Sequence, residues 1–168
     1  MKKNVVLIGM PGAGKSTVGV VLAKRLGMDF VDSDLVIQKQ EGKLLHQLIE
    51  EQGLEGFLET ENRVNAALSP ASAVIATGGS VIYGKEAMEH FSQEAIIIYL
   101  CLSLETIRKR LGDLTERGVA MKDGQTLEEL YEERVPLYQR YARLTIDCEE
   151  KGIRQTAEEI EEALRMET

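Results

Sequence analysis

Glycine, lysine and serine at fixed spacing near the start of the chain can bind a phosphate chain. The segment GMPGAGKST, residues 9–17, matches the pattern G-x-x-x-x-G-K-[ST], follows an apolar run and opens a helical period. Glycines let backbone amides converge on phosphate groups, and the positive end of the following helix strengthens the attraction. We expect Lys15 to reach the terminal phosphates of a nucleotide and the Ser16 hydroxyl to bind Mg²⁺. The expected nucleotide-binding residues here are Gly12, Ala13, Gly14, Lys15, Ser16 and Thr17.

Two carboxylates come at the end of the second apolar stretch, DFVDSD. Asp32 and Asp34 stand two positions apart where a strand is expected to end, and open α/β sheets bind ligands at that edge. We expect Asp32 to face the metal ion, directly or through water. Asp34 is expected to face an acceptor hydroxyl as a base or an orienting group. A competing interpretation is that Asp32 or Ser33 only caps the next helix.

A pair of glycines follows a further apolar run. In VIATGGSVIY, residues 74–83, Thr77, Gly78 and Gly79 come where a buried strand is expected to end. Glycines at this place let backbone amides approach a ligand closely. A purely structural turn is the alternative.

Short apolar runs alternate with helical periods along the whole chain. Runs rich in Val and Ile predict strands that are buried on both faces, as in a parallel sheet. The alternation predicts an α/β doubly wound fold in a single domain of residues 1–168. The five runs are NVVLIG, DFVDSD, AVIAT, AIIIYL and LTID, and helices are expected over 15–27, 35–52, 55–68, 85–91, 104–111, 127–141 and 156–166.

Composition excludes several classes of function. The net charge of −8 argues against a general nucleic-acid surface, because phosphate binding needs clustered cations. No apolar run approaches the length of a membrane span, and the widely spaced Cys101 and Cys148 predict buried thiols in a reducing compartment. We therefore expect a cytoplasmic monomer that acts on a small molecule and binds neither nucleic acid nor membrane.

Residues 112–125, GDLTERGVAMKDGQ, break the alternation with three glycines and few apolar anchors. On length alone, a simple surface connection explains this segment as well as a functional loop does. The arginines favour a functional loop: Arg108 and Arg110 precede the segment, Arg117 lies within it and Arg134 follows it. A mobile loop that carries arginine fits a kinase, which must exclude water before it transfers phosphate. The guanine-specific signature NKxD is absent.

The ordered set of motifs resembles the shikimate kinase family. The matching segments are GMPGAGKST, DSD, GFLETE, TGGS, RKRLGDLTER and EERVPLYQRYA. The resemblance implies a P-loop fold like that of nucleoside monophosphate kinases, with a five-stranded parallel sheet, a substrate-binding region near residues 32–65 and a lid near 112–125. It also implies ATP- and Mg²⁺-dependent phosphorylation of shikimate to shikimate 3-phosphate, a step of aromatic amino acid biosynthesis.

The resemblance implies a role for individual residues as well. Arg110 would pack against the adenine, with Arg154 as a further contact, and Arg117 would reach from the lid to the transferring phosphate. Arg134 would grip the substrate carboxylate. The implied catalytic residues are Lys15, Asp34 and Arg117, the implied substrate-binding residues are Asp34, Leu58, Glu61, Gly78, Gly79 and Arg134, and the implied metal-binding residues are Ser16 and Asp32.

Three places depart from the family pattern. Leu58 stands where the family usually has an arginine that pairs with the substrate carboxylate, Ser80 replaces the third glycine of a triplet, and the lid reads RGVA instead of RPLL. A charged hydrogen bond to a carboxylate contributes roughly 1.5–3 kcal/mol, and Arg134 is still present to hold that group. Two alternatives therefore stay open: a kinase of another polyol or cyclitol, and a nucleotide-binding regulatory protein without turnover.

Overall fold

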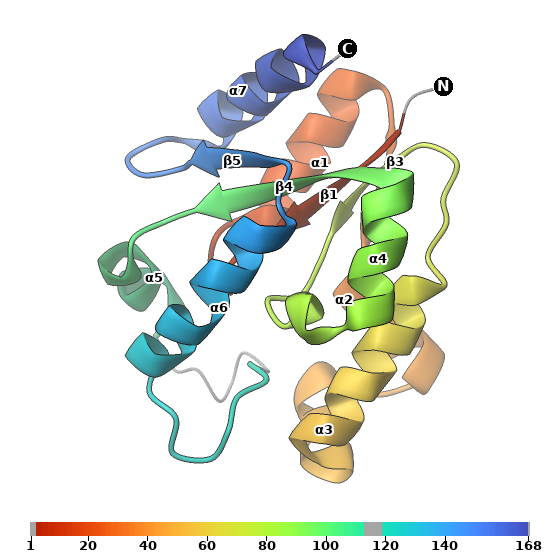
Figure 1. The fold of residues 1–168 in the computed structure, drawn as a ribbon, viewed down its shortest axis with the longest axis vertical. Helices are drawn as coiled ribbons and strands as arrows, with labels where there is room; N and C mark the ends of the chain where they lie inside the picture. The colour runs from red at the N-terminus through yellow and green to blue at the C-terminus, as the bar shows by residue number, and fades with distance from the viewer. Residues whose placement is uncertain (1–2, 113–118, 168) are drawn as a thin grey trace.

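A parallel sheet of five strands forms the centre of the molecule, in the order β2-β3-β1-β4-β5 (Figure 1). The computed structural model describes residues 3–112 and 119–167. Every neighbouring pair of strands is parallel, and β1 and β3 are buried along their whole length. The fold class predicted from the apolar runs is confirmed. The strands are β1 (Asn4–Ile8), β2 (Asp29–Asp32), β3 (Ala73–Ala76), β4 (Ala95–Cys101) and β5 (Leu144–Asp147).

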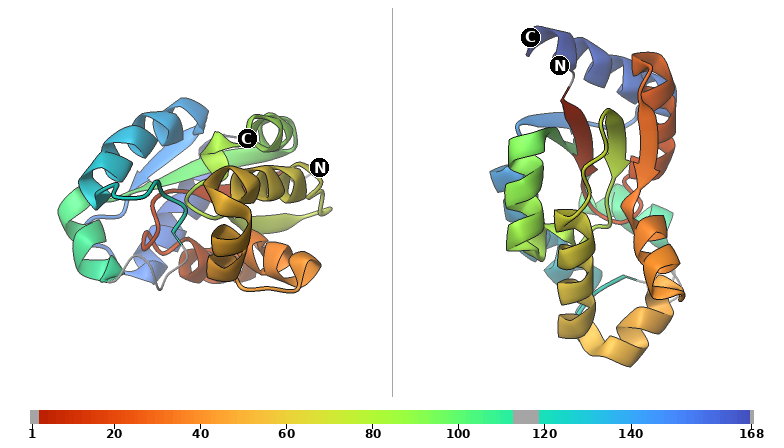
Figure 2. Two further views of the ribbon diagram at one scale, coloured as in Figure 1. Left: turned by 90° about the horizontal axis from the view of Figure 1, so that it is seen from below. Right: turned by 90° about the vertical axis from the view of Figure 1, so that its right-hand side faces the viewer.

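Helices cover both faces of the sheet. Figure 2 shows α1 and α7 on one face and α4 and α6 on the other, while α2 and α3 extend beyond the sheet. No helix among the described residues is long and apolar enough to cross a membrane. The helices are α1 (Lys15–Leu26), α2 (Ser33–Glu41), α3 (Leu45–Ala66), α4 (Lys85–Glu94), α5 (Leu104–Leu111), α6 (Leu127–Tyr141) and α7 (Ile153–Met166), with a short 3-10 turn, η1 (Val81–Tyr83).

The single helix expected over residues 35–52 is wrong. Helix α2 ends at Glu41 and is capped by Gly42, which has a φ of 70°, and α3 begins at Leu45. Gly53 then interrupts α3 with a φ of 73° and a ψ of 173°, at the gap expected between the helices over 35–52 and 55–68. Glycine adopts positive φ without a steric penalty, and the position of Gly42 inside a helical pattern gives no sign of the first break.

The apolar interior is divided into two clusters. The larger one surrounds the sheet. The smaller one lies between α2, α3 and the segment that follows residue 118, and Leu58 packs against its edge. The members of this second cluster are Ile37, Leu48, Phe57, Val64 and Ala120.

The parallel sheet brings separate segments to one edge. The carboxyl ends of parallel strands share an edge, where open α/β sheets bind ligands. The phosphate-binding segment follows β1, Asp32 is the last residue of β2, and Thr77 follows β3. The Thr77 hydroxyl donates to the Leu7 carbonyl at 2.7 Å, which joins the ends of β3 and β1.

Candidate active site

The phosphate-binding segment adopts the turn that its glycines predict. Gly14 caps the start of α1 in the left-handed region, with a φ of 88°. Lys15 is buried, and its amine donates to the carbonyls of Gly9 at 2.7 Å and Met10 at 2.8 Å. Burial lowers the pKa of Lys15 to about 8, although the nearby Asp34 carboxylate opposes this effect. The lysine is therefore held against the loop, facing the site of the terminal phosphates.

Asp32 contacts the Ser16 hydroxyl and also caps the helix that follows it. Its Oδ2 accepts from the Ser16 hydroxyl at 2.9 Å, across the gap between α1 and β2. Its Oδ1 accepts from the backbone amide of Asp34 at 3.0 Å and so caps α2. The cap fixes the carboxylate beside the serine, so the structural role and the predicted metal-binding role are compatible.

Asp34 lies in the first turn of α2 and lines the cavity next to the phosphate-binding loop. Burial raises the pKa of its carboxyl group to about 6, with a further contribution from the charge of Asp32, while Lys15 acts in the opposite direction. Its Oδ1 has no hydrogen-bond partner among the described residues. The group is placed and poised to accept a proton from a ligand hydroxyl near neutral pH.

Glu61 is a buried acid on α3, with an exposed fraction of 2%. The Ser80 hydroxyl donates to its Oε1 at 2.6 Å. Burial raises the pKa of Glu61 to about 7, while the hydrogen bond from Ser80 lowers it. A Cβ atom on Gly78 would lie 2.6 Å from Asp34 Oδ1 and 2.9 Å from Glu61 Oε2. Glycine is required at this position because both carboxyl groups approach its backbone.

Arg134 reaches the site from α6 and is only 1% exposed. Its Nη2 donates to the carbonyl of Ala120, and its guanidinium carbon lies 5.5 Å from the centre of the Tyr83 ring. Its Nε has no hydrogen-bond partner among the described residues. A Cβ on Gly79 would lie 2.9 Å from Arg134 Nη1, so the arginine lies against the glycine pair.

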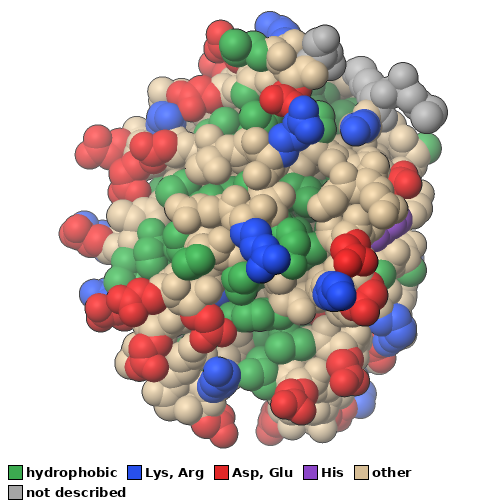
Figure 3. Space-filling view, in the orientation of Figure 1, with side chains coloured by type: hydrophobic (Ala, Val, Ile, Leu, Met, Phe, Trp, Pro, Cys, Tyr) green, Lys and Arg blue, Asp and Glu red, His purple; other side chains and the backbone are tan. Residues whose placement is uncertain are grey.

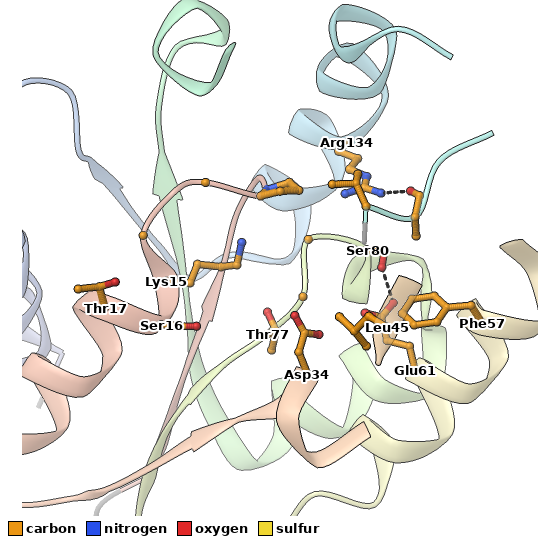
Figure 4. Close-up of a pocket in the computed structure, with 17 residues that line it drawn as sticks. Lys15, Ser16, Thr17, Asp34, Leu45, Phe57, Glu61, Thr77, Ser80 and Arg134 are labelled. Atoms are coloured by element: carbon orange, nitrogen blue, oxygen red, sulfur yellow. Dashed lines mark hydrogen bonds between the residues drawn. The ribbon is translucent and has the colours of Figure 1, made fainter. Parts of the chain in front are cut away.

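One cavity of about 270 Å³ connects these groups (Figure 4). Figure 4 shows Lys15 and Asp34 approaching it from the P-loop and α2, Arg134 from α6, and Leu45 and Phe57 forming an apolar wall beside Glu61. An anion-binding loop, a candidate base and a buried arginine thus face one space. This arrangement can position a phosphoryl donor against a hydroxyl acceptor. The full lining is Pro11, Gly12, Gly14, Lys15, Ser16, Thr17, Asp34, Leu45, Phe57, Glu61, Thr77, Gly78, Gly79, Ser80, Val119, Ala120 and Arg134.

Some residues expected in the site lie elsewhere. Leu58 does not line the cavity and packs against the smaller apolar cluster. Arg110 lies beside the phosphate-binding loop, where its Nη1 donates to the Gly12 carbonyl at 3.1 Å. Arg154 is exposed and pairs with Glu158 on its own helix. The predicted role of Arg117 falls outside the described residues.

Sequence reasoning missed three supporting residues. The first is Tyr138, whose hydroxyl donates to the Gly79 carbonyl at 2.6 Å. Its spacing of four residues from Arg134 was the available signal, because such residues share a helix face. Ser80 was noted only as a departure from a glycine triplet, and no local pattern indicated that Tyr83 lies against Arg134.

The residues at the end of β2 fit Mg²⁺. The described residues contain no group of three or more His, Cys, Asp or Glu side chains that could hold a metal by themselves. Mg²⁺ in phosphoryl-transfer sites binds through one or two carboxylates together with substrate phosphates and water. The hydroxyl of Ser16 and the Oδ2 atom of Asp32 supply oxygen ligands of this kind beside the phosphate-binding loop.

Comparisons with known proteins agree with this geometry. The family model described as shikimate kinase matches residues 11–165. The chain is 35% identical over 162 residues to the shikimate kinase of Vibrio parahaemolyticus, covering 95% of this chain and 94% of that protein. It is 36% identical over 163 residues to the shikimate kinase of Pasteurella multocida, covering 95% and 93%.

Solved structures give the same result. Shikimate kinase from Acinetobacter baumannii, in complex with shikimate, superposes with a TM-score of 0.90 at 32% identity, covering 99% of this chain and 94% of that chain. Shikimate kinase from Aquifex aeolicus superposes with a TM-score of 0.84 at 30% identity, covering 96% of each chain. The chain belongs to the shikimate kinase family and is an ATP- and Mg²⁺-dependent kinase.

Proposed function

We propose that this protein transfers the γ-phosphoryl group of ATP to shikimate, giving shikimate 3-phosphate and ADP. The observation that carries the proposal is the single cavity in which the phosphate-binding Lys15, the buried Asp34 and the buried Arg134 meet. The relative from A. baumannii, solved in complex with shikimate, supports the choice of acceptor. A phosphate site alone does not determine which acceptor binds. A base and an arginine on the far side of the cavity favour an acceptor that carries a hydroxyl group and a carboxylate.

On the nucleotide side, the backbone amides of residues 12–17 surround the β- and γ-phosphates and Lys15 neutralises their charge. Arg110, which is held at the Gly12 carbonyl, packs against the adenine. Ser16 and Asp32 hold Mg²⁺, which neutralises charge on the phosphates. The exposed ion pair of Arg154 gives no support to its expected contact with the adenine.

On the acceptor side, Asp34 orients the reacting hydroxyl and receives its proton. The hydroxyl oxygen forms a bond to the γ-phosphorus while the bond from that phosphorus to the bridging oxygen of ADP breaks. Arg134 binds the carboxylate of shikimate, and the close backbone approach at Gly78 and Gly79 shapes the floor of the site. Arg117 is proposed to stabilise the transferring phosphoryl group from the lid.

The organisation of the whole chain is also proposed. Residues 1–168 form a single kinase domain, with a substrate-binding region near 32–65 and a lid near 112–125. On the face shown in Figure 3, Lys and Arg side chains stand as separate spots among Asp and Glu. Together with the net charge of −8, this supports a cytoplasmic monomer that binds neither nucleic acid nor membrane.

Coupled measurement of ADP release tests the proposed function directly. We expect ADP formation that depends on shikimate, on ATP and on Mg²⁺, with one phosphomonoester formed per ADP, as checked by ³¹P NMR. Asp34→Asn keeps the size of the side chain but removes the base, and we expect kcat to fall by about 10²–10⁴-fold. ADP release that is independent of shikimate, or absent in its presence, contradicts the proposal.

A further inference from the structure

Carboxylate oxygens from α2 and α3 meet at the acceptor end of the cavity. Asp34 Oδ1 and Glu61 Oε2 lie on either side of Gly78, 2.6 Å and 2.9 Å from the point where its Cβ would be. Among the described residues, Asp34 Oδ1 has no hydrogen-bond partner, and the side-chain hydrogen bond of Glu61 is made by its other oxygen, to Ser80. A ligand that satisfies two neighbouring acceptor atoms must bring two neighbouring donors.

Two cations line the cavity among the described residues. Lys15 donates its amine to two loop carbonyls, whereas Arg134 donates through Nη2 to the Ala120 carbonyl, lies against Tyr83 and keeps its Nε without a partner. The side chain next to Glu61 along the helix is Leu58, which packs in the smaller apolar cluster. The partner that holds Glu61 is therefore the uncharged hydroxyl of Ser80.

The wall beyond Glu61 is apolar. Leu45, Phe57, Val119 and Ala120 line this part of the cavity. A second anionic group on an acceptor finds no matching cation there, and burying an unmatched charge is costly. The hydroxyl groups of a polyol, in contrast, can donate to the carboxylate oxygens, and its ring carbons can pack against the apolar wall.

We propose that Ser80 positions Glu61 as a second hydroxyl-binding carboxylate beside Asp34, and that the enzyme consequently also phosphorylates uncharged polyols that carry two neighbouring hydroxyl groups. One hydroxyl donates to Glu61 and the other is phosphorylated. The transfer is unchanged: the oxygen–phosphorus bond forms, the bond to ADP breaks and Asp34 receives the proton. This inference rests on the proposed function, because it uses the same cavity and the same phosphoryl donor.

Comparing the kinetics of a charged acceptor with those of its uncharged counterpart tests which class of acceptor the enzyme uses. Shikimate and its methyl ester share the ring and the three hydroxyl groups and differ in charge, and myo-inositol is an unrelated uncharged polyol. We expect the wild-type enzyme to phosphorylate the ester with a kcat/KM within about 100-fold of that for shikimate, because the charged hydrogen bond from the single arginine, Arg134, contributes roughly 1.5–3 kcal/mol. Turnover of myo-inositol is expected as well, with a higher KM.

Introducing a cation beside Glu61 is expected to change this preference. Leu45→Arg places a cation in the lining of the cavity and should increase the ratio of kcat/KM for shikimate to that for the ester by about 10–100-fold, because it adds one charged hydrogen bond. Met166→Arg adds the same charge at an exposed position near the end of α7 and should leave the ratio unchanged. A wild-type preference for shikimate above 100-fold, or a Leu45→Arg ratio equal to that of the wild type, overturns the inference.

The positioning role of Ser80 has its own readout. Ser80→Ala should lower kcat/KM by about tenfold for both acceptors and move the acidic limb of the pH profile to higher pH, because the lost hydrogen bond favours the charged form of Glu61. Ser80→Thr keeps the hydroxyl and should restore the profile. Ser92→Ala removes a hydroxyl that donates to the Met88 carbonyl outside the cavity and serves as the matched control. An unshifted pH limb in Ser80→Ala overturns the positioning role.

The outcomes also separate this inference from the proposed function. Turnover of shikimate without turnover of either uncharged acceptor leaves the proposed function standing and overturns the inference. Turnover of the uncharged acceptors without shikimate does the reverse. ADP formation with none of the three acceptors contradicts both.

Discussion

Asp34 and Glu61 hold protons more tightly than ordinary carboxyl groups, because burial disfavours their charged forms. Lys15 releases its proton more easily than an ordinary lysine for the same reason. The three groups titrate between pH values of about 6 and 8. If the base must be deprotonated and the lysine must be charged, the enzyme is active only in a narrow range of pH.

We expect a bell-shaped dependence of kcat/KM for shikimate on pH. Activity should rise as Asp34 and Glu61 lose their protons, around pH 6–7, and fall near pH 8 as Lys15 loses its charge. These limbs belong to the coupled set of groups in the free enzyme. Steady-state rates across pH 5–9.5, with the coupling enzymes in excess, measure them. A flat profile from pH 5.5 to 8.5 is incompatible with the buried charges described above.

Replacing Glu61 by glutamine is expected to stabilise the fold at alkaline pH while it impairs the acceptor site. The raised pKa means that ionised Glu61 destabilises the folded state fully above about pH 7, and that this cost declines as pH falls from 7 towards the unfolded value near 4.5. Glu61→Gln should therefore raise the free energy of unfolding by about 1–3 kcal/mol at pH 8. Thermal unfolding at pH 8 and pH 5 measures the difference, which should be large only at pH 8.

The turn η1 and helix α6 hold Arg134 from two sides. Tyr83 places its ring near Arg134 and donates its hydroxyl to Glu133 at 2.6 Å. Tyr138, one helical turn after Arg134, holds the glycine segment through the Gly79 carbonyl. The position of the guanidinium is thus a property of two packed elements and not of the arginine alone.

Removing the ring of Tyr83 is expected to weaken shikimate binding. Tyr83→Ala should raise KM for shikimate by about 3–10-fold through loss of the cation–π contact, with a smaller effect on kcat. Tyr83→Phe keeps the ring and loses the hydroxyl with its bond to Glu133, so its KM should stay within about twofold of the wild-type value. Steady-state kinetics of the two variants compare the ring with the hydroxyl, and equal effects would show that the ring is not what holds Arg134.

The distance between interacting residues determines how much the sequence could predict. The phosphate-binding loop consists of nine consecutive residues, so its role could be predicted from the sequence without knowledge of the fold. The strands were correct because buried parallel strands are continuous apolar runs. The break at Gly42 was missed, since a glycine inside a helical pattern marks a break only when its φ is positive. The interruption at Gly53 coincides with the gap expected between the helices over 35–52 and 55–68.

Contacts between residues that lie far apart in the chain could not be predicted from the sequence. Ser80 and Glu61 are separated by 19 positions, and their hydrogen bond depends on how η1 packs against α3. The position of Leu58 was misjudged by a single step around the helix. Phe57 and Glu61 share the face that lines the cavity, while Leu58, about 100° further around the helix from Phe57, does not line it. Periodicity alone does not decide which neighbouring face a helix presents to a ligand.

Nucleotide binding is expected to stabilise the whole molecule. The phosphate site joins α1, the end of β2 and α2 through the contacts of Lys15, Ser16 and Asp32. MgADP at about 100 times its Kd should add about 2.7 kcal/mol to the free energy of unfolding, which corresponds to an increase in Tm of several degrees. Thermal shift assays measure this, and Lys15→Ala should abolish most of it. An equal shift in that variant would place the nucleotide elsewhere.

The smaller apolar cluster, which α2 and α3 form apart from the sheet (Figure 1), has a consequence for evolution. Leu45, Phe57 and Ala120 of the acceptor wall belong to or pack against this cluster, whereas Val119 and the P-loop pack in the main core. A substitution of one of those three wall residues therefore disturbs a small cluster, and the P-loop keeps its support. The acceptor specificity of this enzyme can therefore change in evolution through substitutions at a few positions, while the ATP-binding site is conserved.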